Sequence, residues 1–177
     1  MTDIINEITS DPKLIKNYIE KIEDSKIWIP DNYEDELASL LKLDGMLVSK
    51  ITGPENYQTL INFLTKMQAC RERVVEIKRH LIALLKYWQK LQRTAVRYIN
   101  ITYFAKLEAL RDGSRKAVVA AAILPIEEGV NEIANLAEQA ELVLKHLDNT
   151  VWNIKEESGM IDEYHSLIRN LSLTKEV

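Results

Sequence analysis

The longest hydrophobic pattern of the chain lies between Tyr57 and Arg111. Apolar side chains recur there at alternating intervals of three and four residues, at Met67, Cys70, Val74, Ile77, Leu81, Leu84, Trp88, Leu91, Ala95 and Tyr98. This spacing is the a/d seam of a heptad repeat, which requires a partner helix along its length. The pattern predicts one long amphipathic helix. The β-branched cluster from Ile99 to Thr102 is the most favourable place for a break.

A second heptad pattern follows Asp112 and Gly113, which favour the end of the first helix. Its apolar positions are Val119, Ile123, Ile126, Val130, Ile133, Ala137, Ala140, Leu144, Leu147, Val151 and Ile154. With Ser114 as its N-cap, this helix would fold back on the first as an antiparallel αα-hairpin. A register centred on the turn places Trp88 opposite Ala137.

Shorter patterns precede the hairpin. We expect residues 2–10 to be a frayed helical turn or a tail. Asp11 and Pro12 suit the N-cap and first position of a helix that continues to about Asp24. A further helical pattern spans Glu34 to Lys50.

Other local signals concern connectors and ends. Trp28 lies in the connector Ser25–Asn32, where it either anchors an arm on the bundle, the interpretation we favour, or forms a partner-docking peptide. Pro125 and Gly129 predict a kink in the second long helix rather than its end. A last short helix is expected after Gly159.

Glycine and proline are scarce, with 5 and 4 residues, so the chain has few turns. We predict an all-α fold: an elongated antiparallel two-helix hairpin with coiled-coil-like heptads plus shorter N- and C-terminal helices. Its predicted divisions are an acidic helical arm (1–53), the hairpin with a basic first helix (54–157), and a short C-terminal helix and tail (158–177).

Charge is distributed unevenly along the chain, although the formal net charge is only −4. Residues 1–64 hold 6 basic and 12 acidic side chains, residues 65–116 hold 13 and 4, and residues 117–177 hold 4 and 11. The three segments therefore carry −6, +9 and −7. A strongly basic middle between acidic flanks is the most informative feature of the composition.

No apolar run is long enough to span a membrane, and no signal peptide is evident at the start. The single cysteine, Cys70, cannot form an internal disulfide, and its seam position favours a buried core residue over a reactive thiol. These features predict a cytoplasmic protein, which for a phage-encoded chain means the host cell cytoplasm.

Patterns typical of enzymes are lacking. The three histidines, His80, His146 and His165, have no metal-ligand spacing, and we expect each to be a surface or boundary residue. There is neither a glycine-rich phosphate loop nor a GxSxG motif. We therefore expect a non-enzymatic protein without cofactor or metal.

The basic residues of the first long helix are ordered as well as numerous. Five of them fall at outward f and c heptad positions, on one stripe of about 27 Å: Arg79, Lys86, Lys90, Arg93 and Arg97. Acidic residues of the second helix could neutralise the stripe, since the hairpin register pairs Arg93 with Glu132. The pattern is compatible both with a basic face that is merely solvated and with one that binds a ligand.

Basic and aromatic residues continue toward the predicted hairpin tip, at Tyr103, Lys106, Arg111, Arg115 and Lys116. Cations that bind phosphates and aromatic rings that stack on unpaired bases are the components of sequence-neutral single-strand binding. Tyr103 and Phe104 are adjacent, so at most one of them is expected to face inward.

The segments AKLEALRDGSRKAVVAAA (105–122) and LDNTVWNIKEESGMI (147–161) resemble the layout of the T4-type phage recombination mediators. That resemblance implies an oligomeric, helical protein that binds single-stranded DNA and helps to load a strand-exchange recombinase. It marks Lys106 and Arg111 as DNA contacts. The Asp-Gly-Ser turn is shorter than the glycine-rich loop of the family.

The expected function is thus that of a single-stranded nucleic-acid-binding accessory protein, a homo-oligomer that can also bind a protein partner. The alternative is a helical structural or protein-interaction module, such as a virion component, an adaptor or a small phage inhibitor. The two differ in whether binding to a protein requires nucleic acid.

Overall fold

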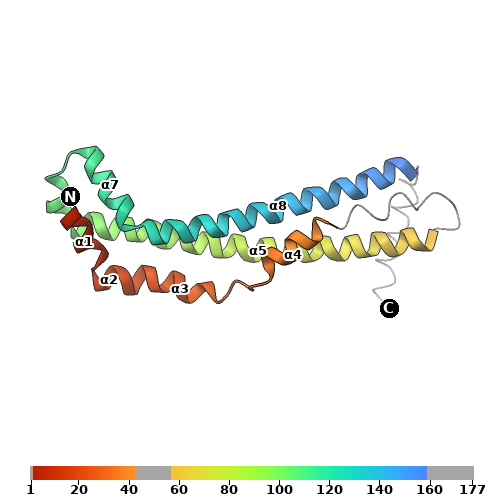
Figure 1. Cartoon of the computed structure of the whole chain (residues 1–177), viewed down its shortest axis with the longest axis horizontal. Helices are drawn as coiled ribbons and strands as arrows, with labels where there is room; N and C mark the ends of the chain where they lie inside the picture. The colour runs from red at the N-terminus through yellow and green to blue at the C-terminus, as the bar shows by residue number, and fades with distance from the viewer. Residues whose placement is uncertain (1, 43–56, 159–177) are drawn as a thin grey trace. The chain divides into compact units, whose positions relative to one another are not determined.

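The computed structural model describes residues 2–42 and 57–158, and all regular structure in these residues is helical (Figure 1). This confirms the predicted all-α class. The helices are α1 (Thr2–Thr9), α2 (Pro12–Leu14), the π-helical η1 (Ile15–Ile19), α3 (Glu20–Lys26), α4 (Tyr33–Leu40), α5 (Tyr57–Thr102), α6 (Phe104–Glu108), α7 (Asp112–Ala122) and α8 (Leu124–Ser158).

The long helix α5 follows the predicted seam. Most of its fully buried residues sit at a/d positions, among them Val74, Ile77, Leu81, Trp88 and Ala95. At the end of the helix the fully buried residue is Ile99, next to the predicted seam residue Tyr98, which is half-buried. The helix ends at Thr102, and Tyr103 leaves helical geometry with φ −106° and ψ 18°. The break expected at the β-branched cluster is therefore confirmed, because such side chains crowd the turn before them.

The chain divides into two compact units, both of which take segments from α5 and α8. One unit contains residues Met1–Tyr33 and Lys78–Glu138, and the other contains residues Glu34–Ile77 and Gln139–Val177. In the first unit, α8 packs on α5, and the arm formed by α2, η1 and α3 lies against both. The elongated hairpin stays a prediction, as does the three-part division along the chain.

Trp88 forms the centre of the first unit. Its ring is fully buried, and its indole N–H donates to Ser25 Oγ of α3 at 2.7 Å. The ring also lies against Gly129 of α8, where an added Cβ would approach the ring at 3.0 Å and Ile22 at 3.1 Å. Three helices thus meet at one aromatic side chain, with its polar atom satisfied.

The contact with Gly129 corrects the predicted register. The predicted partner of Trp88, Ala137, lies eight positions further along the chain than Gly129. The largest seam residue does face a very small one, but the segment between the long helices is longer than a tight turn. Residues that the prediction placed in paired helices belong to α6 and α7 instead.

The segment between α5 and α8 differs from the predicted Asp-Gly turn. Asp112 and Gly113 begin α7 rather than end α5, and the N-cap is Arg111, not Ser114. An acidic residue in a first helical turn is favourable, so Asp112 is compatible with a helix start as well as a stop. The predicted kink at Pro125 is a helix end: α7 stops at Ala122 and α8 begins at Leu124.

The first residues are ordered, contrary to the prediction of a frayed turn or tail. Residues 2–9 form the helix α1, which buries Ile8 completely and packs against α7. The cap predicted at Asp11 is confirmed, since its carboxylate accepts from the Lys13 amide at 2.8 Å. The following helix continues to Lys26, two residues beyond the predicted end.

In the second unit, an ion pair joins α4 to the first part of α5. Arg73 Nε donates to Glu36 Oε1 at 2.7 Å, beside the buried Leu37 of α4. The predicted helix 34–50 is thus present as far as Leu40. Leu41 and Lys42 form a turn. Residues 43–50, the start of the long helix at Pro54, and the predicted helix after Gly159, with His165, lie outside the described residues.

Candidate nucleic-acid interface

The basic stripe, which we define as Arg79, Lys86, Lys90, Arg93 and Arg97, is built by the periodicity of α5. Its members follow one another at intervals of seven, four, three and four residues, so they lie along one face of the helix. The buried seam occupies the opposite face, with Leu81, Leu84 and Trp88 turned inward. All five stripe residues are exposed.

None of the five stripe residues forms an ion pair within the part of the chain that the structure describes. The polar contact of Arg93 is with the carbonyl of Gln89, one turn earlier on the same helix. The predicted register paired Glu132 with Arg93. In the structure, Glu132 Oε2 lies instead 3.9 Å from Lys26 Nζ. The stripe is therefore not neutralised in the way that the predicted hairpin register implied.

Arginines on the first part of α5 are used differently. Arg71 contacts Asp148 at 2.9 Å, and Arg73 contacts both Glu36 and Glu76. These arginines join helices within the second unit. α5 thus carries two ion-paired arginines, Arg71 and Arg73, whereas its cations from Arg79 onward form no ion pair among the described residues.

Four of the five basic and aromatic residues predicted near the tip make contacts within the first unit. Tyr103 donates its hydroxyl to Asp11 at 3.1 Å, and Lys106 forms an ion pair with Glu7. Arg115 donates to the Leu107 carbonyl, and Lys116 pairs with Asp112. The fifth residue, Arg111, is exposed at the start of α7.

Phe104, rather than Tyr103, is the exposed aromatic residue at the end of α5. Its side chain is 59% exposed, whereas Tyr103 is half-buried. This agrees with the expectation that only one of the two faces inward. The two hydroxyl groups of Tyr98 and Tyr103 both donate to Asp11 Oδ2, at 2.7 and 3.1 Å.

These bonds shift the titration of all three groups. Burial acts to raise the pKa of Asp11, but the hydrogen bonds from Tyr98, the Lys13 amide and Tyr103 outweigh it and lower the pKa below its ordinary value. The pKa of Tyr98 is raised by its bond to Asp11 and by burial. Burial and then the bond to Asp11 raise the pKa of Tyr103 to about 12.

A second aromatic cluster lies beside the basic stripe, formed by Trp28, Tyr33, His80 and Tyr87. The ring centroids of Trp28 and Tyr87 are 6.2 Å apart, and Tyr33 contacts the His80 ring edge-on at 6.1 Å. His80 Nε2 donates to the Trp28 carbonyl at 2.7 Å. Trp28 thus contacts α5, as predicted, yet its side chain is 55% exposed.

This cluster was not predicted from the sequence as part of the site. Trp28 was recognised as an anchor, and His80 as a surface or boundary residue. Their proximity depends on a contact between residues that are 52 positions apart. A usable signal was the position of Tyr87, which follows Lys86 directly and precedes Lys90 by three residues on the same helix.

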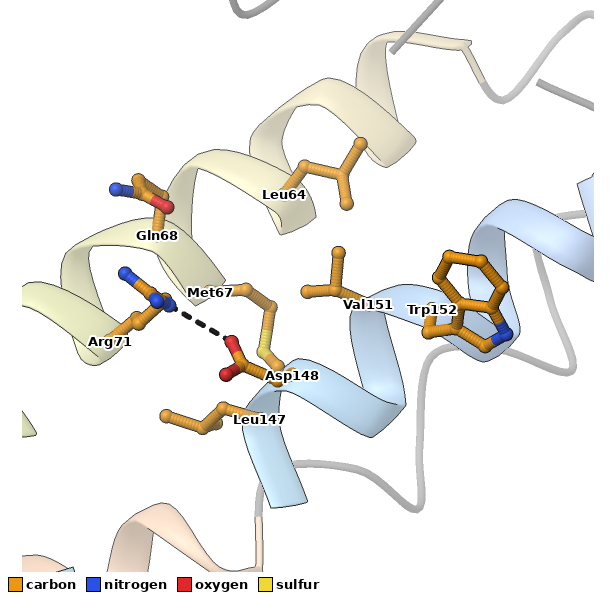
Figure 2. Close-up of a pocket in the computed structure, with 8 residues that line it drawn as sticks. All are labelled: Leu64, Met67, Gln68, Arg71, Leu147, Asp148, Val151 and Trp152. Atoms are coloured by element: carbon orange, nitrogen blue, oxygen red, sulfur yellow. Dashed lines mark hydrogen bonds and ion pairs between the residues drawn. The ribbon is translucent and has the colours of Figure 1, made fainter. Parts of the chain in front are cut away.

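A small pocket of about 250 Å³ lies in the second unit, between α5 and α8 (Figure 2). It is lined by Leu64, Met67, Gln68, Arg71, Leu147, Asp148, Val151 and Trp152. Figure 2 shows the two charged groups, Arg71 and Asp148, directed toward each other. The pocket is therefore lined by apolar side chains together with Gln68 and the Arg71–Asp148 pair, whose charges compensate one another.

Residues 2–42 and 57–158 contain no group of three or more His, Cys, Asp and Glu side chains that could hold a metal ion. No helix in these ranges has both the length and the apolar character to cross a membrane. Cys70 is half-buried on the seam, and burial raises the pKa of its thiol, which disfavours the reactive thiolate.

Comparisons of the chain with protein-family models, curated proteins and solved structures gave no match.

Proposed function

We propose that this protein binds single-stranded nucleic acid through the basic stripe of α5, as an accessory protein that catalyses no reaction. The observation that supports this most directly is the exposure of five aligned cations without ion pairs among the described residues. The resemblance to recombination mediators suggests a role in phage recombination for a homo-oligomeric form.

The proposed mechanism is electrostatic. Phosphates of the bound strand lie along the stripe and replace condensed counterions, so affinity arises largely from counterion release. Long, flexible lysine and arginine side chains can follow a backbone of variable shape. Because the stripe offers charges and no fixed set of base-reading groups, binding is expected to be insensitive to sequence.

A charge-reversal variant tests this proposal. Lys86→Glu, Lys90→Glu and Arg93→Glu combined should reduce affinity for a single-stranded oligonucleotide at least about tenfold at low salt, since three phosphate contacts become repulsive. Fluorescence anisotropy measures the affinity, and circular dichroism should show unchanged helicity because all three side chains are exposed.

The matched control reverses three exposed charges on the N-terminal arm, with Lys13→Glu, Lys16→Glu and Lys21→Glu. It alters the net charge of the protein equally and leaves the stripe intact. Equal loss of affinity in the two variants would mean that net charge, not the stripe, governs binding. Wild-type affinity in the stripe variant would reject the proposal.

The alternative function, a protein-interaction module, is favoured by a different observation. Trp152, which lines the pocket of the second unit, is 55% exposed, and Leu142 on the same helix is 54% exposed. Apolar surface of this kind is typical of interfaces between chains. Binding to a protein that survives nuclease treatment and reversal of the stripe would support this alternative.

A further inference from the structure

We propose that Trp28 is a base-stacking platform that makes the stripe prefer single strands over duplexes. This inference rests on the proposed function, because it assumes that phosphates bind along the stripe. It adds a specific contact: the exposed indole face receives an unpaired nucleobase of the strand whose phosphates lie on Lys86 and Lys90.

The position of Trp28 supports this assignment. Residues three and four apart are neighbours on a helix surface, so Tyr87 borders Lys90. Tyr87 in turn contacts the Trp28 ring, with centroids 6.2 Å apart. The indole therefore stands at the edge of the stripe, where a base attached to a stripe-bound phosphate can be placed.

The backbone around Trp28 is fixed before any ligand binds. The Trp28 amide donates to the Ser25 carbonyl at 3.0 Å, and its own carbonyl accepts from His80 at 2.7 Å. The Tyr33 ring contacts the His80 ring in an edge-on arrangement. A ring whose backbone is already fixed loses little conformational entropy on binding, which favours its use in recognition.

Trp28 and Phe104 are the two exposed aromatic residues among those described in the first unit, and Trp28 is the one that contacts Tyr87 beside the stripe. Trp88 is fully buried, and Tyr98 and Tyr103 are held by Asp11. Trp28 contacts Tyr87 at a tilt of 40° and is 55% exposed to solvent. An aromatic ring beside a row of cations suits an unpaired base, because stacking needs a free π-face that a duplex does not offer.

The test compares Trp28→Ala and Trp28→Phe with the wild-type chain. Trp28→Ala should lower single-strand affinity by about 5- to 150-fold, the range expected for loss of one base–aromatic stack. Duplex affinity should change by less than about twofold, since duplex binding depends on phosphates alone. Trp28→Phe should retain most of the single-strand affinity because it retains an aromatic face.

Trp152→Phe is the matched control, since Trp152 has the same 55% exposure but belongs to the second unit. Binding of a single strand should quench tryptophan fluorescence in the Trp152→Phe variant and much less in Trp28→Phe. The backbone hydrogen bonds of residue 28 do not depend on its side chain, so the loop should persist in all variants.

The remaining outcomes separate the two proposals. Unchanged single-strand affinity in Trp28→Ala, with loss in the stripe variant, would overturn the stacking role and leave the proposed function standing. Equal losses for single strands and duplexes, or equal losses in the Ala and Phe variants, would also overturn stacking. Absence of binding by the wild-type chain at low salt would reject both.

Discussion

Asp11 performs two functions with one carboxylate. Its carboxylate caps the helix that begins at Pro12, and Oδ2 also accepts hydrogen bonds from Tyr98 and Tyr103. The arm is thus fixed to the end of α5 by contacts that join residues 87 and 92 positions apart. Hydrogen bonds to a charged acceptor are stronger than neutral ones, so this cluster is an important anchor of the arm.

The contribution of this anchor to stability is expected to decrease both in acid, where Asp11 is protonated, and in alkali, where Tyr103 is deprotonated. The pKa of Asp11 is lowered from 3.8 on folding, so its contribution is present above that value and is lost as pH falls through the folded-state pKa. The pKa of Tyr103 is raised from 10.0 to about 12, so its contribution is present below 10.0 and is lost as pH rises toward 12.

Asp11→Asn tests this account. Asparagine caps a helix as well as aspartate does, so the substitution weakens the bonds to the tyrosines and preserves the cap. We expect a loss of about 1 kcal/mol in the free energy of unfolding at neutral pH, measured by urea denaturation. The difference between variant and wild type should shrink as pH falls through the lowered folded-state pKa of Asp11, because the carboxylate charge is then lost.

A difference that persists undiminished in acid would contradict the assigned role of the carboxylate charge. Spectrophotometric titration provides an independent check: one tyrosine should titrate near 12 in the wild type and at a lower pH in Asp11→Asn.

At the scale of elements, the packing of α3, α5 and α8 depends on Gly129. Glycine usually weakens a helix, but here it provides space rather than a special backbone conformation. A Cβ at this position would lie 3.0 Å from Trp88 Cζ3 and 3.1 Å from Ile22 Cγ2, closer than ordinary van der Waals contact. Both neighbours are buried, so neither can move freely.

The same substitution at two glycines should therefore have opposite effects. Gly129→Ala should destabilise the protein by about 1 kcal/mol net, because overpacking exceeds the gain in helix propensity. Gly113→Ala, in α7, should stabilise it by up to about 1 kcal/mol, since an added Cβ meets nothing within 4 Å. Thermal unfolding measures both, and stabilisation by both would contradict the packing described for Trp88.

The elements differ in how well the sequence predicts them. The seam of α5 was predictable because burial imposes a period that the sequence records, as at Leu81 and Trp88. The outward position of the stripe followed from the same period. By contrast, Asp112 suits both a helix stop and a helix start, so local signals alone could not place the turn.

Contacts between distant segments were not predictable from local patterns. The helix α1 packs against α7, and no periodicity in eight residues indicates such a partner. The same holds for the bonds of Asp11 and for the contact of His80 with Trp28. As a result, the sequence indicated the cations of the candidate interface but not its aromatic platform.

At the scale of the whole molecule, basic and acidic side chains are concentrated in different segments of the chain. The chain carries a formal charge of −4, yet residues 65–116 carry 13 basic and 4 acidic side chains. Part of this positive charge is compensated by ion pairs such as Arg71 with Asp148, and the stripe is not compensated among the described residues. Attraction to an anionic strand should therefore be local to α5 and sensitive to salt.

Salt dependence of binding tests the central claim most directly. Affinity for a short labelled single strand would be measured by fluorescence anisotropy between about 50 and 200 mM salt. Five phosphate contacts predict a slope of about −3.5 in a plot of log affinity against log salt concentration. No binding at the low-salt end, or affinity independent of salt, would contradict a phosphate-binding role for the stripe.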